Sequence, residues 1–419
     1  MSRTCFLIIC LLMNLQNTEG NAPDSWTRKA DFPVNIDAGS HYGVGFSIGN
    51  KGYFSTGRNF QGLASKALWS YDPTLDSWTQ EADFGGLGRN NAVAFSIGHK
   101  AYLGTGWDVS LGNYFKDFWE YDPTSNSWTE IAGLPGGERH EAVGFAIGNR
   151  GYVCSGVDSN FYYKRDLWEY NPANNTWNQK ADLTGIPRAG AVGFGTSTKG
   201  YIGTGYDGSQ SRFKDFWEYN QATNSWVQIP DLPGTERSEA IAFSINGYGF
   251  VTTGRMYSGS FPALRDLYEY DPANHSWAQK ANLSGTQRTL ASGFSIGNKG
   301  YVGIGWDGNF AYLNDFWEYT PDLITGINDD QNSLTENIFV YPNPNNGSFS
   351  LKFNQLKNFG RDFTIEVFTM TGKRIYVKEN SLLPQTTSIP IQIPNIHPGI
   401  YLLKVKTGNH IGATRLIIE

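Results

Sequence analysis

The fold is decided by a segment that reads Glu120-Tyr121-Asp122-Pro123-Thr124-Ser125-Asn126-Ser127-Trp128, because close variants of it recur along the chain. The tryptophans that end these segments are residues 26, 78, 128, 177, 226 and 277, so they lie 49 to 52 residues apart. A fixed period of about 50 residues is typical of a repeat architecture in which each repeat is one supersecondary unit. The period therefore limits the fold before any single strand is assigned.

Each period contains four strand signals, as the third period illustrates. Residues 142–147 alternate in polarity and end in a Gly-Asn turn, and residues 151–156 follow as a hairpin partner. A third strand is predicted over 166–170, where Pro172 ends it because proline cannot donate to a strand ladder. A fourth strand is predicted over 177–180. Four short strands per repeat predict an all-β propeller blade.

The repeats resemble the kelch family. The resemblance rests on the Trp/Tyr-Glu-Tyr-Asp/Asn-Pro segment, on the closing tryptophan, and on a doublet of small residues after the second strand, such as Thr105-Gly106 and Ser155-Gly156. The family doublet is Gly-Gly, whereas its first member here is Thr, Ser or Ile. The resemblance covers about residues 22–321 and implies a six-bladed kelch β-propeller, with the propeller domain spanning 21–321.

The two ends of the repeat region predict how the ring closes. The sixth repeat runs through Trp317-Glu318-Tyr319-Thr320-Pro321 and lacks a closing tryptophan. Residues 25–31 match residues 77–83, which form the last strand of the first repeat. We therefore expect the N-terminal strand, with Trp26, to complete the sixth blade. Closure of this kind removes the open edges of a sheet array.

The composition and the N-terminus favour an exported protein. The 419 residues include 17% charged and 15% aromatic residues with a net charge of −6, which does not favour nucleic-acid binding. Residues 1–20 read as a signal peptide cut after Gly20, with Arg3 before the apolar run 6–13, and this run is too short to span a membrane. Cys154 would then be the remaining cysteine and is expected to be a packing thiol. The six scattered histidines predict no metal site, and no cofactor is expected.

A second domain follows a polar linker over residues 322–338. Residues 339–419 alternate like a small Ig-like β-sandwich and contain Tyr341-Pro342-Asn343-Pro344, Thr371-Gly372-Lys373 and Gly399-Ile400-Tyr401. These motifs resemble the type A C-terminal sorting domain of the Bacteroidetes type IX secretion system. The resemblance implies the secretion machinery as a partner. It also implies a location outside the cell or on the outer-membrane surface after signal-peptide cleavage, with the sorting domain usually lost on export.

One repeated position carries positive charge six residues before the central Phe of the first strand. It is occupied by Arg89, Arg139, Arg188, Arg237 and Arg288, and by Ser40 in the first repeat. In kelch propellers this position leads to the mouth of the channel, where guanidinium groups would bind an anion or a carboxylate. The alternative is that each arginine pairs with an Asp, a Glu or a carbonyl of a neighbouring blade as a structural element.

The positions that differ between repeats say more about a ligand. Trp107, Tyr206 and Trp306 follow the small doublet, and Tyr162 lies in the variable loop of the third repeat. Aromatic side chains in such loops suit stacking on sugar faces or contacts with a protein. These four residues and the five arginines form the predicted ligand-binding set. Two residues beyond the arginine position, the repeats read Tyr42, Asn91, Glu141, Gly190, Glu239 and Leu290.

Three functions fit these observations. The first is a non-catalytic, monomeric binding module that engages an extracellular glycan or protein through one face. The second is a sugar-modifying enzyme resembling N-acetylneuraminate epimerase, for which the catalytic candidates are Arg139 with Glu141 and Arg237 with Glu239. The third is a structural adhesin repeat. A buried Glu141 carboxyl beside convergent arginines would favour the enzyme, whereas salt bridges from both glutamates to neighbouring blades would favour binding or a scaffold.

Overall fold

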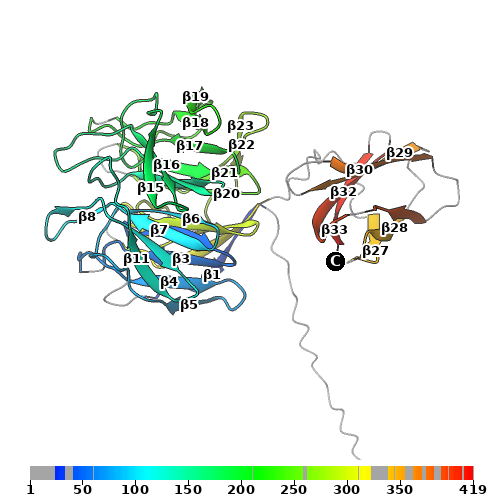
Figure 1. Cartoon of the computed structure of the whole chain (residues 1–419), viewed down its shortest axis with the longest axis horizontal. Coiled ribbons are helices and arrows are strands. Elements are labelled where there is room, and N and C mark those ends of the chain that lie inside the picture. The colour runs from blue at the N-terminus through cyan, green and yellow to red at the C-terminus, as the bar shows by residue number, and fades with distance from the viewer. Residues whose placement is uncertain are drawn as a thin grey trace, which may run out of the picture. The chain divides into compact units, whose positions relative to one another are not determined.

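The chain forms two compact units in this computed structural model, residues 1–321 and 322–419 (Figure 1). The structure describes residues 24–33, 41–59, 61–209, 211–257, 262–309, 311–321, 338–343, 345–353, 362–369, 374–381, 388–394, 396–407 and 410–418. The predicted signal peptide and all of the predicted linker except residue 338 lie outside these ranges. Over the described part every regular element is a strand, so the all-β prediction is confirmed. No described helix has the length and apolarity needed to cross a membrane.

The first unit contains six four-stranded antiparallel sheets, which we number blades 1 to 6 along the chain. Each blade starts with an inner strand and ends with an outer strand. Blade 1 contains β2 (Val44–Ile48), β3 (Lys51–Ser55), β4 (Leu68–Asp72) and β5 (Ser77–Gln80). Blade 2 contains β6 (Val93–Ile97), β7 (Lys100–Gly104), β10 (Phe118–Asp122) and β11 (Ser127–Ile131). Blade 3 contains β12 (Val143–Ile147), β13 (Arg150–Cys154), β14 (Leu167–Asn171) and β15 (Thr176–Lys180).

Blades 4 to 6 repeat this order. Blade 4 contains β16 (Val192–Gly195), β17 (Lys199–Gly203), β18 (Phe216–Asn220) and β19 (Ser225–Ile229). Blade 5 contains β20 (Ile241–Ile245), β21 (Tyr248–Thr252), β22 (Leu267–Asp271) and β23 (Ser276–Lys280). Blade 6 contains β24 (Ser292–Ile296), β25 (Lys299–Gly303), β26 (Phe316–Thr320) and β1 (Ser25–Lys29). A short hairpin of β8 (Trp107–Asp108) and β9 (Asn113–Tyr114) extends blade 2.

The blades form a closed ring. Each inner strand contacts the inner strand of the next blade, and the series returns from β24 to β2. Strand β1 pairs with β26 as the outer strand of blade 6, with Trp26 opposite Tyr319. This is the pairing expected from the missing tryptophan at the end of the sixth repeat.

Each repeated segment forms a latch onto the preceding blade. In blade 2 the Oδ1 of Asn126 accepts hydrogen bonds from the hydroxyl of Tyr121 (2.8 Å) and from the amide of Ala82 in blade 1 (3.0 Å). The indole of Trp128 donates to the carbonyl of Ala82 (3.2 Å). The repeated tyrosine, asparagine and tryptophan therefore satisfy both backbone groups at the residue that follows the neighbouring outer strand.

The latch varies where the neighbouring backbone changes. In blade 5 the indole of Trp277 still donates to a carbonyl, that of Pro230 (2.8 Å). Proline has no amide hydrogen, and the acceptor position is His275, which contacts the hydroxyl of Tyr270 (3.0 Å). The acceptor is Asn or Asp in the other latches, with Asp76 in blade 1 and Asp24 in blade 6, and it is replaced by His275 where the neighbouring residue offers no amide hydrogen.

Packing between blades explains the glycine at the second position of the second strand in five of the six blades; blade 2 has Ala101 there. A Cβ atom added to Gly151 would lie 2.0 Å from the ring of Phe95, which belongs to the preceding blade. Phe95 itself is 4% exposed. Only glycine leaves room for this ring, and close packing of this kind accounts for the repeated Lys/Arg-Gly-Tyr sequence.

The second unit is built from two sheets. One sheet has the order β27-β28-β31 and the other has the order β30-β29-β32-β33. The strands are β27 (Ile338–Tyr341), β28 (Ser348–Phe353), β29 (Asp362–Thr369), β30 (Arg374–Ser381), β31 (Ser388–Gln392), β32 (Gly399–Thr407) and β33 (His410–Ile418). Side chains from both sheets share one buried core, which includes Leu351, Ile391, Val367 and Leu403. The two sheets therefore pack face to face.

Candidate functional site

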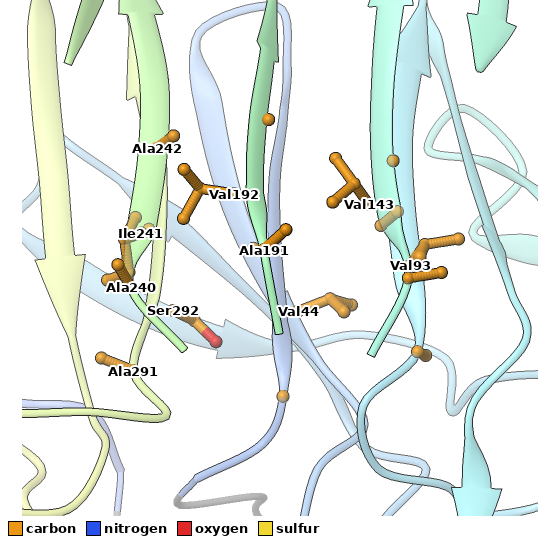
Figure 2. Close-up of a pocket in the computed structure, with 18 residues that line it drawn as sticks. Val44, Val93, Val143, Ala191, Val192, Ala240, Ile241, Ala242, Ala291 and Ser292 are labelled. Carbon is orange, nitrogen blue, oxygen red and sulfur yellow. The ribbon is translucent and has the colours of Figure 1, made fainter. Parts of the chain in front are cut away.

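The centre of the ring is an apolar channel. Its cavity of about 150 Å³ is lined by glycine, alanine, valine, isoleucine and serine residues of the six inner strands. Figure 2 shows Val93, Val143 and Val192 on neighbouring strands around it. None of the residues that line this cavity is titratable, so acid–base or charged recognition would have to occur at an end of the channel.

A ring of backbone hydrogen bonds closes in on one end of the channel. Six residues, one from each blade, immediately precede the lining residues, and each amide donates to the carbonyl of the preceding member at 2.8 to 3.3 Å. The members are Tyr42, Asn91, Glu141, Gly190, Glu239 and Leu290. Their φ angles lie between 54° and 59°, a left-handed conformation that is costly for the five non-glycine residues. Strain of this kind is often retained at functional sites.

Glu141 lies at this end of the channel, which we call the channel mouth. Its Oε2 accepts a hydrogen bond from the hydroxyl of Tyr206 (2.7 Å), and its Oε1 accepts one from Nδ2 of the Asn91 side chain (3.2 Å). The Nδ1 of His140 lies 3.6 Å from the same Oε1. A Cβ atom at Gly190 would lie 3.0 Å from the Tyr206 ring, so the glycine leaves space for this contact.

Glu239 lies on the other side of the mouth, in blade 5. Its Oε1 accepts a hydrogen bond from Nη2 of Arg255 (2.6 Å), and its Oε2 accepts one from the hydroxyl of Thr289 in blade 6 (3.2 Å). The Glu239 side chain is 5% exposed. Tyr42 of blade 1 is influenced by both glutamates, since burial and then the nearby Glu239 and Glu141 charges raise the pKa of its hydroxyl. Blades 1, 3, 4 and 5 thus bring charged and phenolic groups together at the mouth.

The two carboxyl groups have different proton affinities. Burial, with a further contribution from the charge of Glu141, raises the pKa of Glu239 to about 7 despite the pairing with Arg255. Burial also acts to raise the pKa of Glu141, but its contacts with His140 and Tyr206 outweigh this effect and lower that pKa below the ordinary value. One carboxyl can therefore hold a proton near neutral pH while the other stays ionised.

The five repeated arginines are buried in the propeller and are not exposed at the channel mouth. Each is fully buried and forms an ion pair of 2.6 or 2.7 Å with the aspartate that precedes the third strand of its own blade. Arg139, for example, contacts both oxygens of Asp166 and also donates to the carbonyls of Ser155 (3.0 Å) and Gly136 (2.6 Å). Oδ2 of Asp166 accepts a further hydrogen bond from the indole of Trp168 (2.6 Å).

The loop aromatics sit around the mouth in different ways. Trp107 is half-buried and stacks on His140 with ring centroids 5.2 Å apart. Trp306, also half-buried, pairs through its backbone with Thr289, whose side chain contacts Glu239. Tyr162 is 68% exposed, with Nζ of Lys164 6.0 Å from its ring.

Comparison with known proteins decides the family. Residues 88–135 match the model of the Kelch motif, and residues 339–419 match that of the secretion system C-terminal sorting domain. The chain is a kelch-repeat propeller with a C-terminal sorting domain. Both resemblances seen in the sequence are thereby confirmed, and the type IX sorting domain marks this kelch protein for export to the cell surface or the medium.

Solved structures show the same fold. The protein in "Structure of YjhT" is similar to this kelch protein with a TM-score of 0.60 at 17% sequence identity. The match covers 69% of this chain and 95% of that chain. No protein among those with curated annotation matches the sequence.

The structure separates the residues predicted for the kelch ligand site into two groups. Glu141, Glu239 and Tyr206 come together at the mouth, and Trp107 and Trp306 flank it. The five arginines instead form buried ion pairs, as in the structural alternative. That alternative placed the partner in a neighbouring blade, which is wrong, because each aspartate lies in the arginine's own blade.

Arg255 and Tyr42 were missed by sequence reasoning. Arg255 occupies the position after the small doublet that Trp107, Tyr206 and Trp306 occupy in other blades, and Arg58 occupies it in blade 1. Comparing this position across all six repeats, rather than its aromatic members alone, would have pointed to Arg255. The contacts of the two glutamates fit neither the enzyme criterion, a Glu141 carboxyl beside convergent arginines, nor the scaffold criterion, salt bridges from both glutamates to neighbouring blades. Glu239 pairs with Arg255 of its own blade. Glu141 is held by Tyr206 and Asn91 of neighbouring blades.

Proposed function

We propose that the exported kelch protein binds a glycan at the channel mouth. The observation that carries this proposal is the Glu141–Tyr206 and Glu239–Arg255 pair of contacts, which places fixed acceptors and donors from blades 3, 4 and 5 at one opening. Sugar hydroxyls require such donors and acceptors, and Trp107 and Trp306 offer aromatic faces beside them. The packing strands are nearly alike in every blade, so selectivity comes from these residues that differ.

A double substitution of the flanking tryptophans tests the proposal. We expect Trp107→Ala with Trp306→Ala to weaken glycan binding by about 1–3 kcal/mol, because partly exposed aromatic anchors lose their stacking surface. The melting temperature should change little, since both side chains are half-buried loop residues. A glycan array identifies the ligand, and calorimetry with that ligand measures the difference.

The matched control is Trp168→Ala, because the Trp168 indole hydrogen-bonds to Asp166, the half-buried partner of Arg139. This change should lower stability and leave the affinity of the remaining folded protein intact. Unchanged glycan binding by the loop variant, or binding only to a protein partner, would contradict the proposal as stated.

The second candidate is an acid–base enzyme acting on a sugar. The two carboxyl groups with separated pKa values favour it, because such pairs are frequent at catalytic sites. In this candidate Glu239 would carry the proton and Glu141 would act as the base. Proton NMR of the array-identified sugar, with and without the protein, separates the two candidates by whether the anomers or epimers interconvert faster.

The raised pKa of Glu239 predicts a pH dependence of stability. Because this pKa lies above the ordinary value of 4.5, the folded state holds the proton more tightly than the unfolded state. The contribution of Glu239 to the free energy of unfolding should therefore be complete below pH 4.5 and decline as the pH rises toward about 7. Glu141, with a lowered pKa, loses its contribution only on further acidification.

Glu239→Gln should flatten this decline in denaturant titrations at several pH values. Glu130→Gln, at an exposed position on β11, is the control and should leave the profile unchanged. An unaltered decline in the Glu239→Gln protein would contradict the assignment of the proton to Glu239.

A further inference from the structure

The start of the sorting domain holds the end of its last strand. Oδ1 of Asn343 accepts the amide hydrogen of Ile417 (2.8 Å), and the backbone amide of Asn345 donates to the Ile417 carbonyl (3.0 Å). The side-chain amide of Asn345 donates to that same carbonyl (3.2 Å). Asn345 also forms a parallel bridge with Ile418. The amide and the carbonyl of Ile417 are therefore both hydrogen-bonded to residues more than 70 positions earlier in the sequence.

Asparagine suits this position because its side chain carries both a donor and an acceptor, as a peptide group does. While Nδ2 of Asn345 faces Ile417, its Oδ1 accepts the amide hydrogen of Gly347 (2.8 Å). Gly347 has a φ of 93°, which permits the turn into β28. Asn345 is 7% exposed, so its loss would leave buried polar groups without partners.

The last residues of an edge strand fray unless they are tied down. Strand β33 lies at the edge of its sheet, next to β32 alone in the strand order. Its last residues are nevertheless fixed twice, by the burial of Leu416 and Ile418 in the core and by the two asparagines. Packing of the domain core explains why Leu416 and Ile418 are buried, but it does not require the hydrogen bonds of the two asparagines.

We infer that the secretion machinery recognises the end of β33 in this clamped form, as a composite surface of residues 341–343, 345–346 and 416–418. Asn343 and Asn345 are then positioning residues for export. The partner is a protein component of the machinery that accepts an ordered strand end beside the exposed ring of Tyr341, which is 65% exposed and lies 4.9 Å from Nζ of Lys352. This inference rests on the sorting-domain match and is independent of the ligand proposed for the channel mouth.

The decisive variant is Asn345→Asp in the full chain. Aspartate keeps an acceptor for Gly347 but cannot donate to the Ile417 carbonyl. Asn346→Asp is the matched control, because it makes the same change in charge at the exposed neighbouring residue. Protein outside the cells and protein held in the periplasm are measured by immunoblot in a bacterium with type IX secretion, and hydrogen exchange is followed on the purified proteins.

We expect Asn345→Asp to reduce the exported fraction at least tenfold and to speed exchange at the Ile417 amide, while the Leu403 and Val405 amides stay protected. Asn346→Asp should export normally. Deletion of residues 339–419 sets the lower limit, with a folded propeller retained in the periplasm. Normal export of that deletion would refute the sorting role itself, which separates failure of the premise from failure of the clamp.

Normal export of Asn345→Asp together with fast exchange at Ile417 would overturn the inference, as would equal loss of export in Asn346→Asp. If Asn345→Asp unfolds the whole domain, Asn343→Ala decides, because Asn343 is exposed and its substitution removes the acceptor for the Ile417 amide. Reduced export of that variant with a protected core supports the clamp, and normal export with fast exchange at Ile417 overturns it.

Discussion

Deleting residues 21–31 is expected to make the propeller aggregate. The deletion removes β1 and leaves the full length of β26 without its outer partner. An exposed strand edge recruits other chains, because its amide and carbonyl groups are unpaired. Size-exclusion chromatography should show assemblies much larger than the intact protein forms under the same conditions.

The same deletion removes the sixth latch. Oδ1 of Asp24 accepts the hydroxyl hydrogen of Tyr319 (2.9 Å) and the amide hydrogen of Ala281 (2.8 Å), and the indole of Trp26 donates to the Ala281 carbonyl (2.8 Å). Asp24→Asn keeps the acceptor and serves as the control, which should remain monomeric. A peptide of residues 21–31 added in trans should restore solubility. A deletion variant that stays monomeric with an unchanged melting temperature would show that closure does not depend on β1.

Arg139→Ala is expected to lower the free energy of unfolding by about 3–5 kcal/mol, because it leaves the carboxylate of a buried pair without its counter-charge. The guanidinium of Arg139 is fully buried, and its Asp166 partner also holds Trp168 in place. Burial by itself would raise the pKa of Asp166, but the hydrogen bond and charge of Arg139 outweigh it and keep that pKa below the ordinary value. Urea denaturation measures the loss.

Arg150→Ala is the control for this prediction, since Arg150 contacts only the carbonyl of Asn149 at the surface among the described hydrogen bonds. Its stability should stay within about 0.5 kcal/mol of the parent. An Arg139→Ala protein that keeps its stability but loses affinity for acidic ligands would restore the arginines to the ligand site.

The repeat could be predicted from the sequence because each blade forms latch hydrogen bonds of the same kind with the preceding blade. Asn126 and Trp128 bind the backbone of the preceding blade, and the Tyr121 hydroxyl holds the Asn126 side chain in place. Every blade that is held in this way needs equivalent residues. The closure by β1 was predictable for the same reason, since the sixth blade lacked one part of a set that the others shared. Physical constraints that repeat in every blade leave a periodic signal.

The role of the arginines was also encoded, but in a second position. Aspartates precede the third strand in blades 2 to 6, and blade 1, which has Ser40 in place of the arginine, has Ala67 in place of the aspartate. Because the arginine and the aspartate are both missing from the same repeat, the two residues are expected to form an ion pair in the other repeats. Reading the arginine position alone suggested a cationic collar, whereas reading both positions would have indicated internal ion pairs.

The channel mouth could not be derived in the same way. Glu141 and Tyr206 are 65 residues apart and belong to different blades, and no other blade repeats their contact. Their meeting depends on the radius of the closed ring and on the space left at Gly190. Sequence reasoning could identify the positions that differ between blades, but not which of those side chains would reach one another.

The closure by β1 also determines the order in which the molecule can be completed. Asp24 and Tyr319 are separated by 295 positions, so bringing them together costs about 5 kcal/mol of chain entropy by a flexible-loop estimate. Contacts this distant in sequence slow folding, because the entropy is lost before the contacts form. The ring cannot close until its first strand, β1, and its last strand, β26, are present in the same compartment. The propeller is therefore complete only when both ends of the repeat region have come together.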